Sequence, residues 1–122
     1  MRRLTLYTLS VFYFVAGANH FLHPDFYLGL IPDYIPFHVF TNYMVGALEL
    51  ILAMMLWLPR TRRMGAWGIV LLLVLLVPSH VYFIQVGSCV PNSLCIKEWI
   101  SWSRLLIGQP LLIWWAWGLR NV

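Results

Sequence analysis

Long apolar stretches alternate with short polar segments along the whole chain. Four stretches are almost free of charge: residues 4–21, 41–58, 64–85 and 99–119. A helix needs about 20 mostly apolar residues to cross a membrane, and each stretch has close to that length. We therefore predict an all-α fold, a polytopic membrane protein in which one domain over residues 1–122 forms a four-transmembrane-helix bundle.

The first apolar stretch also has the features of a secretory signal peptide. Arg2 and Arg3 precede the apolar residues 4–15, and the small residues 16–18 resemble a cleavage site. We expect the segment to be retained instead, as a first helix that continues through His20 and Phe21.

Composition and the placement of basic residues support a membrane protein and predict its orientation. Of 122 residues, 61% are hydrophobic and only 10% are charged, which is too little charge for a soluble surface. If both termini lie in the cytoplasm, six arginines are cytoplasmic and the opposite loops contain one cation, Lys97. The six are Arg2, Arg3, Arg60, Arg62, Arg63 and Arg120. The net charge of +4 therefore indicates topology, and no basic patch suggests nucleic-acid binding.

The two loops on the outer side differ in character. Residues 20–40 contain three prolines but also many large apolar residues, so we expect this Pro-rich segment to fold over the outer mouth of the bundle or to lie in the membrane interface. The second loop contains both cysteines, Cys89 and Cys95, which can form a disulfide outside the cytoplasm. Their spacing lacks the C-x-x-C geometry of redox centres, so a structural bond is favoured.

Polar residues within the apolar stretches gather in the outer half. Glu49 lies roughly 12 Å below the outer end of its helix, and Arg104 and His80 each lie roughly 8 Å below theirs. His20 and Asn19 lie at the outer end of the first helix. An unpaired charge at such depth costs about 2.5–3.5 kcal/mol. We therefore predict that Glu49 faces inward, pairs with Arg104 and has His20 and His80 as further partners.

Helical spacing extends this candidate site. Asn42, Gly46, Glu49 and Ala53 form one small or polar stripe, which is typical of a face that packs against other helices. Gln109 is out of phase with Arg104, but Pro110 can disturb the local winding and free the Leu106 carbonyl. Trp102 is close enough to Arg104 in sequence to line a pocket.

Two plainer interpretations stand beside the functional one. The polar network can act only as glue that fixes the register of the helices. The loop residues His23, Asp25, Asp33 and His38 lack a tight metal-ligand spacing, so we predict no metal site.

Four sequence motifs resemble those of the DoxX-like small membrane proteins. They are "AGANHFLHP" at the end of the first helix, "IPDYIPF" in the outer loop, "GALELILA" in the second helix and "RLLIGQPLLIWWAW" in the fourth. Carried over residue by residue, the family pattern corresponds to Gly17, His20, Phe21, Pro24, Pro32, Pro36, Gly46, Glu49, Arg104 and Gln109. The cysteine loop is not part of that pattern.

The resemblance implies a four-helix bundle in the cytoplasmic (inner) membrane of a prokaryote. The family takes its name from a subunit of a thiosulfate:quinone oxidoreductase, and some relatives are accessory or chaperone proteins for other membrane proteins. Membership therefore does not imply an enzyme.

Several functions are compatible with these residues. The leading hypothesis is a binding module, in which a pocket in the outer half accepts a quinone, a lipid or another amphipathic molecule. The alternatives are a quinone-linked oxidoreductase subunit, an accessory protein for a larger membrane complex, and an acid–base isomerase. No cofactor is indicated beyond a possible quinone, and a homo-oligomer or a partner membrane protein is compatible with so small a bundle.

Overall fold

The computed structural model describes residues 2–91 and 93–122, and it confirms the all-α class. The helices are α1 (Arg2–Leu22), α2 (Pro24–Leu28), α3 (His38–Trp57), α4 (Arg62–Gln85), α5 (Glu98–Ser103), the π-helix η1 (Arg104–Gly108) and α6 (Gln109–Gly118). No β-strand occurs in the described ranges, where Cys89 and Cys95 form only an isolated bridge.

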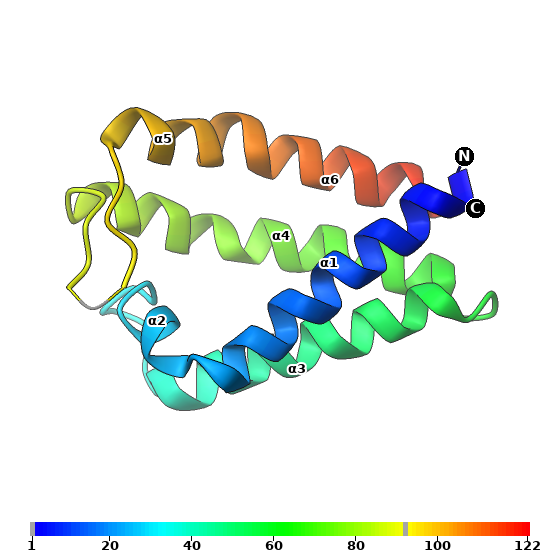
Figure 1. Cartoon of the computed structure of the whole chain (residues 1–122), viewed down its shortest axis with the longest axis horizontal. Coiled ribbons are helices and arrows are strands. Elements are labelled where there is room, and N and C mark those ends of the chain that lie inside the picture. The colour runs from blue at the N-terminus through cyan, green and yellow to red at the C-terminus, as the bar shows by residue number, and fades with distance from the viewer. Residues whose placement is uncertain (1, 92) are drawn as a thin grey trace.

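The long helices pack in the order α1, α3, α4 and α6 (Figure 1). Helix α1 packs mainly on α3, α3 packs on α4, and α4 packs on α5, η1 and α6. Helix α1 runs obliquely to the others, and both chain termini lie at the same end of the molecule (Figure 1). The helices therefore converge at that end, while α1 diverges from α5 and α6 toward the other end.

The buried apolar core lies at the end where the termini meet. It contains Leu6, Leu9 and Tyr13 of α1, Ala53 and Leu56 of α3, Ala66, Ile69 and Leu73 of α4, Ala116 of α6, and Leu119. These residues come from the start of α1 and α4 and from the end of α3 and α6. The opposite half of the molecule is consequently free to enclose a cavity.

Two glycines allow α1 and α3 to approach each other closely. A Cβ atom placed on Gly17 would lie 2.8 Å from the carbonyl oxygen of Gly46 and 3.0 Å from the nitrogen of Leu50. Small residues permit such backbone contacts between helices. Because His20 follows Gly17 by one turn and Glu49 follows Gly46 by one turn, the contact brings those two polar side chains together.

The last helical segment differs from the single continuous helix predicted for residues 99–119. Five residues, Arg104–Gly108, form a π-helix between α5 and α6, and the backbone N–H of Gln109 donates to the carbonyl of Arg104. Pro110 has no N–H, so the Leu106 carbonyl lacks its usual partner four residues later. The wider turn accommodates that loss.

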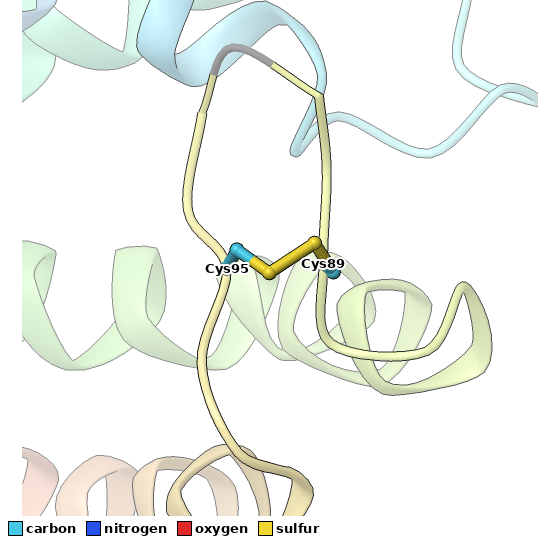
Figure 2. The surroundings of a disulfide bond; sticks show 2 residues. All are labelled: Cys89 and Cys95. Atoms are coloured by element: carbon cyan, nitrogen blue, oxygen red, sulfur yellow. A yellow bond between two sulfur atoms is a disulfide. The ribbon is translucent and has the colours of Figure 1, made fainter.

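The connection after α1 and the connection after α4 are fastened to each other. Cys89 and Cys95 are joined by a disulfide that closes a small hairpin below α2 (Figure 2). The Ser93 hydroxyl of this hairpin donates to the Phe26 carbonyl of α2. In addition, a Cβ atom on Gly29 would collide with the Val90 side chain. The disulfide hairpin and the segment after α2 therefore form one packed layer.

Two helices, α3 and α4, are long and apolar enough to cross a membrane.

Candidate functional site

A cavity of about 580 Å³ lies mainly in the half of the molecule opposite the core, and the core residues Tyr13 and Leu73 also line it. Its walls come from α1, α2, α3, α4, η1 and α6, and from the loop at residues 30–35. The polar lining residues are Tyr13, His20, Tyr27, Thr41, Asn42, Glu49, Ser79, His80, Arg104 and Gln109. The structure thus brings His20, Glu49, His80, Arg104 and Gln109, all predicted from the sequence, around one space.

The first wall is a buried polar network between α1 and α3. His20 Nδ1 lies 2.7 Å from Asn42 Oδ1, and Asn42 Nδ2 donates to the His20 carbonyl at 3.0 Å. His20 Nε2 lies 3.4 Å from Glu49 Oε2. Glu49 is only 5% exposed, and its Oε2 has no hydrogen-bond partner in the described structure. Asn42 therefore orients His20, and His20 faces the Glu49 carboxyl group.

This geometry favours one shared proton between His20 Nε2 and Glu49 Oε2. Because the Asn42 amide nitrogen is committed to a carbonyl, its oxygen accepts a hydrogen bond, and His20 Nδ1 is the donor. A deprotonated Nε2 facing a carboxylate would place two lone pairs against each other. One proton between Nε2 and Oε2 removes that repulsion, whether it resides on the imidazole or on the carboxyl group. With that one proton the pair is neutral overall.

The opposite wall contains a cation without a carboxylate partner. The Arg104 guanidinium lies 5.6 Å from the centre of the Phe83 ring. The ion pair found among the described residues is His20–Glu49, so no carboxylate lies within 4.0 Å of Arg104. The predicted Glu49–Arg104 pair is therefore wrong. The prediction fails because of the packing order of the helices. Arg104 begins η1, which packs with α5 on α4, whereas Glu49 lies on α3 against α1.

The π-helix explains how Gln109 joins the same wall as Arg104. The two residues are five positions apart, a spacing that would place them on different faces of an α-helix. The wider π turn places both at the cavity, where Gln109 Nε2 donates to the Leu73 carbonyl of α4 at 3.2 Å. His80 lines the cavity with them. π-bulges occur frequently at functional sites.

A short cover lies over the network. The Tyr27 ring of α2 stacks on the His20 ring with centroids 3.8 Å apart. Its hydroxyl accepts a hydrogen bond from Asn19 Nδ2 at 2.7 Å. The Ser79 hydroxyl of α4 donates to the Leu30 carbonyl, also at 2.7 Å. The segment between α1 and α3 is therefore attached to both α1 and α4 at the cavity.

Two predicted site residues do not line the cavity. Trp102 is 44% exposed, and its indole lies 3.5 Å from a carboxylate oxygen of Glu98 on the outer surface of α5. Asn19 lies behind the lining residue Tyr27, to whose hydroxyl it donates a hydrogen bond. A spacing of two residues at the junction of α5 and η1 places Trp102 and Arg104 on different faces.

Five polar lining residues were not among the predicted site residues: Tyr13, Tyr27, Thr41, Asn42 and Ser79. Asn42 belongs to the recognised stripe and lies two turns before Glu49, so its spacing carried a usable signal. Tyr13 lies seven residues before His20 and has a buried hydroxyl without a partner in the described structure. Tyr27 lies in the Pro-rich segment, and nothing in the sequence indicates that it stacks on His20.

Neither Cys89 nor Cys95 lines the cavity. Among the residues that the structure describes, no group of three His, Cys, Asp or Glu side chains could hold a metal ion.

Comparison with known families assigns the chain. A family model described as a domain of unknown function, DUF8561, matches residues 9–120, and the chain belongs to that family. No DoxX family model matches, so the membership predicted from the four motifs is wrong. The motifs are short and degenerate, and their residues recur here within another family. No curated protein and no solved structure matches the chain.

Proposed function

We propose that this protein is a four-span membrane protein that binds one small amphipathic molecule in the cavity. Helices α3 and α4 are each long and apolar enough to cross a membrane. Helix α1 has 21 residues and α5, η1 and α6 follow one another without a break over residues 98–118, so each is about 32 Å long. That length matches a hydrocarbon thickness of about 30 Å.

The outer surface and the charge distribution support the same proposal. Large apolar side chains such as Leu4, Ile51, Leu71 and Trp114 are exposed, each on a different one of the four long segments. Exposed apolar surface of this extent is typical of contact with lipid or with another protein. The arginines at the start of α1, in and just after the turn between α3 and α4, and after α6 lie at the end that holds the core (Figure 1). The positive-inside rule places that end, with both termini, in the cytoplasm.

The observation that carries the binding proposal is the unsatisfied polar lining of a roomy, mostly apolar cavity. A volume of about 580 Å³ falls within the usual range for small-molecule sites. The Tyr13 hydroxyl is buried without a partner in the described structure, and a buried polar group without a partner costs about 1–3 kcal/mol. A ligand with a polar head and an apolar tail would relieve that cost and fill the space.

The test compares substitutions that fill the cavity with a matched substitution outside it. Ala16 lines the cavity, whereas the neighbouring Val15 faces outward and is exposed. Mass spectrometry of small molecules that co-purify with gently solubilised protein should detect a defined amphiphile in the wild type and in Val15→Phe. The same molecule should be depleted in folded Ala16→Phe. Identical, generic phospholipid in all three samples would instead favour the interpretation of the network as structural glue.

None of the three alternative classes gains a specific observation. Electron transfer from the cysteines to a ligand would bring the disulfide to the cavity, but the disulfide lies in the hairpin outside it. A quinone remains one member of the amphipathic class that this cavity would accept. Pull-down from native membranes is the measurement that would reveal an accessory role.

A further inference from the structure

The charges around the cavity do not balance, and this imbalance bears on the chemistry of the ligand. The inference rests on the proposed function, because it names the class of molecule that the cavity binds. The ionisable groups of the lining are His20, Glu49, His80, Arg104 and two tyrosines, Tyr13 and Tyr27. The remaining acidic residues, Asp25, Asp33 and Glu98, are exposed and do not line the cavity.

The only carboxyl group of the lining is already committed. Glu49 faces His20 Nε2 at 3.4 Å, and Asn42 holds the His20 ring from the other side. With one proton shared between Nε2 and Oε2, this pair is neutral overall. The pair therefore supplies no negative charge to the rest of the cavity.

Arg104 is consequently an uncompensated cation. Its guanidinium has no carboxylate within 4.0 Å and no side-chain hydrogen bond within the described residues, and it lies against the face of the Phe83 ring. A guanidinium presents five N–H donors in a planar fork and remains protonated in proteins. His80 lines the same cavity and likewise makes no side-chain hydrogen bond with the described residues. An arginine placed in this way is short of both a counter-charge and acceptor oxygens.

We propose that the ligand is an amphiphile with an anionic oxygen headgroup, held by Arg104, and an apolar tail that lies along the leucine-rich part of the cavity. A carboxylate or a phosphate would accept two parallel hydrogen bonds from the guanidinium and neutralise it. The apolar lining residues Leu72, Leu76 and Leu112 would contact the tail. Such a headgroup has two sources, a single-chain acid or an anionic phospholipid.

The test compares probes that differ only in the charge of the headgroup. Full-length protein in phosphatidylcholine nanodiscs is titrated with dodecanoate, dodecanol or dodecyltrimethylammonium, and binding is measured by equilibrium dialysis against empty nanodiscs. Charge-assisted hydrogen bonds predict that dodecanoate binds about 10–100-fold more tightly than dodecanol, and that the cationic probe binds most weakly. Arg104→Gln should abolish this preference, and Arg104→Lys should retain part of it. Arg120→Gln is the matched control, because Arg120 stacks on Trp117 at the opposite end of the molecule.

The outcomes separate this inference from the proposed function. Equal binding of dodecanoate and dodecanol to the wild type would overturn the anionic headgroup while leaving amphiphile binding intact. Binding of neither probe would overturn the inference and, together with an absence of any co-purified amphiphile, the proposed function as well. The wild-type comparison decides the matter even if an Arg104 variant fails to fold. If the preference is found, phosphatidylglycerol in the nanodiscs should either displace dodecanoate, which identifies a lipid headgroup, or leave it bound, which identifies a single-chain acid.

Discussion

Replacement of Gly17 by alanine should separate α1 from α3 and destabilise the half of the molecule that contains the cavity. The added Cβ would lie 2.8 Å from the Gly46 carbonyl oxygen, whereas ordinary van der Waals contact begins at 3.4 Å. Two of the three nearest atoms belong to the backbone of α3, so a rotamer change of Leu50, the third, cannot relieve the collision. The difference between those distances requires the two helices to separate by about 0.6 Å.

Three contributions determine the size of the effect. Overpacking of a close contact costs about 1–3 kcal/mol. The separation also strains three hydrogen bonds between α1 and α3, formed by Ser10, His20 and Asn42, and such bonds within membranes average about 0.6 kcal/mol each. Alanine recovers about 1 kcal/mol through its higher helix propensity. We therefore expect the free energy of unfolding to fall by about 2 kcal/mol.

Reversible unfolding in mixed micelles of increasing SDS content, followed by circular dichroism, measures this change. Gly118→Ala is the matched control, because a Cβ atom on Gly118 meets nothing within 4 Å, and helix propensity alone should leave that variant unchanged or slightly more stable. The reasoning is refuted if Gly17→Ala is as stable as Gly118→Ala. Loss of bound amphiphile without loss of stability would also contradict the proposed cause.

Three further predictions use the same unfolding assay. Asn42→Ala should lower the free energy of unfolding by about 1–3 kcal/mol, because the buried His20 Nδ1–H loses its acceptor; a neutral result would show that water replaces the amide. Substitution of both Cys89 and Cys95 by serine should cost about 2 kcal/mol through loop entropy. It should also speed hydrogen exchange in α2, and unchanged exchange would mean that the hairpin does not stabilise that helix. Arg62→Ala should cost about 1–2 kcal/mol, because its guanidinium donates to the carbonyls at the end of α3. Arg63→Ala is the matched control, because the exposed Arg63 side chain makes no such bond in the described structure. Equal effects of the two variants would contradict a capping role for Arg62.

The hydrophobic pattern located the long helices well, because apolar runs of the required length leave little choice of backbone structure. The stripe of Asn42, Gly46, Glu49 and Ala53 is buried as its spacing predicts. The sequence also indicated that Pro110 disturbs the last helix. It did not show that the disturbance takes the form of a π-helix over Arg104–Gly108, because the choice between a kink and a wider turn depends on packing against α4.

The pairing within the site is the part that sequence reasoning missed. Opposite charges made Glu49 and Arg104 the natural partners, but charge alone does not specify which helices are neighbours. That information resides in the contact between Gly17 and Gly46, which places α1 against α3 and gives Glu49 a histidine as its partner. The stacking of Tyr27 on His20 depends on the path of a proline-rich loop, for which periodicity carries no signal.

The separation of the apolar core from the cavity has an evolutionary consequence. Residues that hold the helices together lie toward the end with the termini, and the polar lining lies toward the other end. A substitution at a lining residue outside both the core and the hydrogen bonds between helices, such as Leu76, therefore leaves those stabilising contacts untouched, and additivity of distant mutations implies that the two sets of effects combine independently. Members of one family built in this way can diverge in what they bind without passing through unstable intermediates.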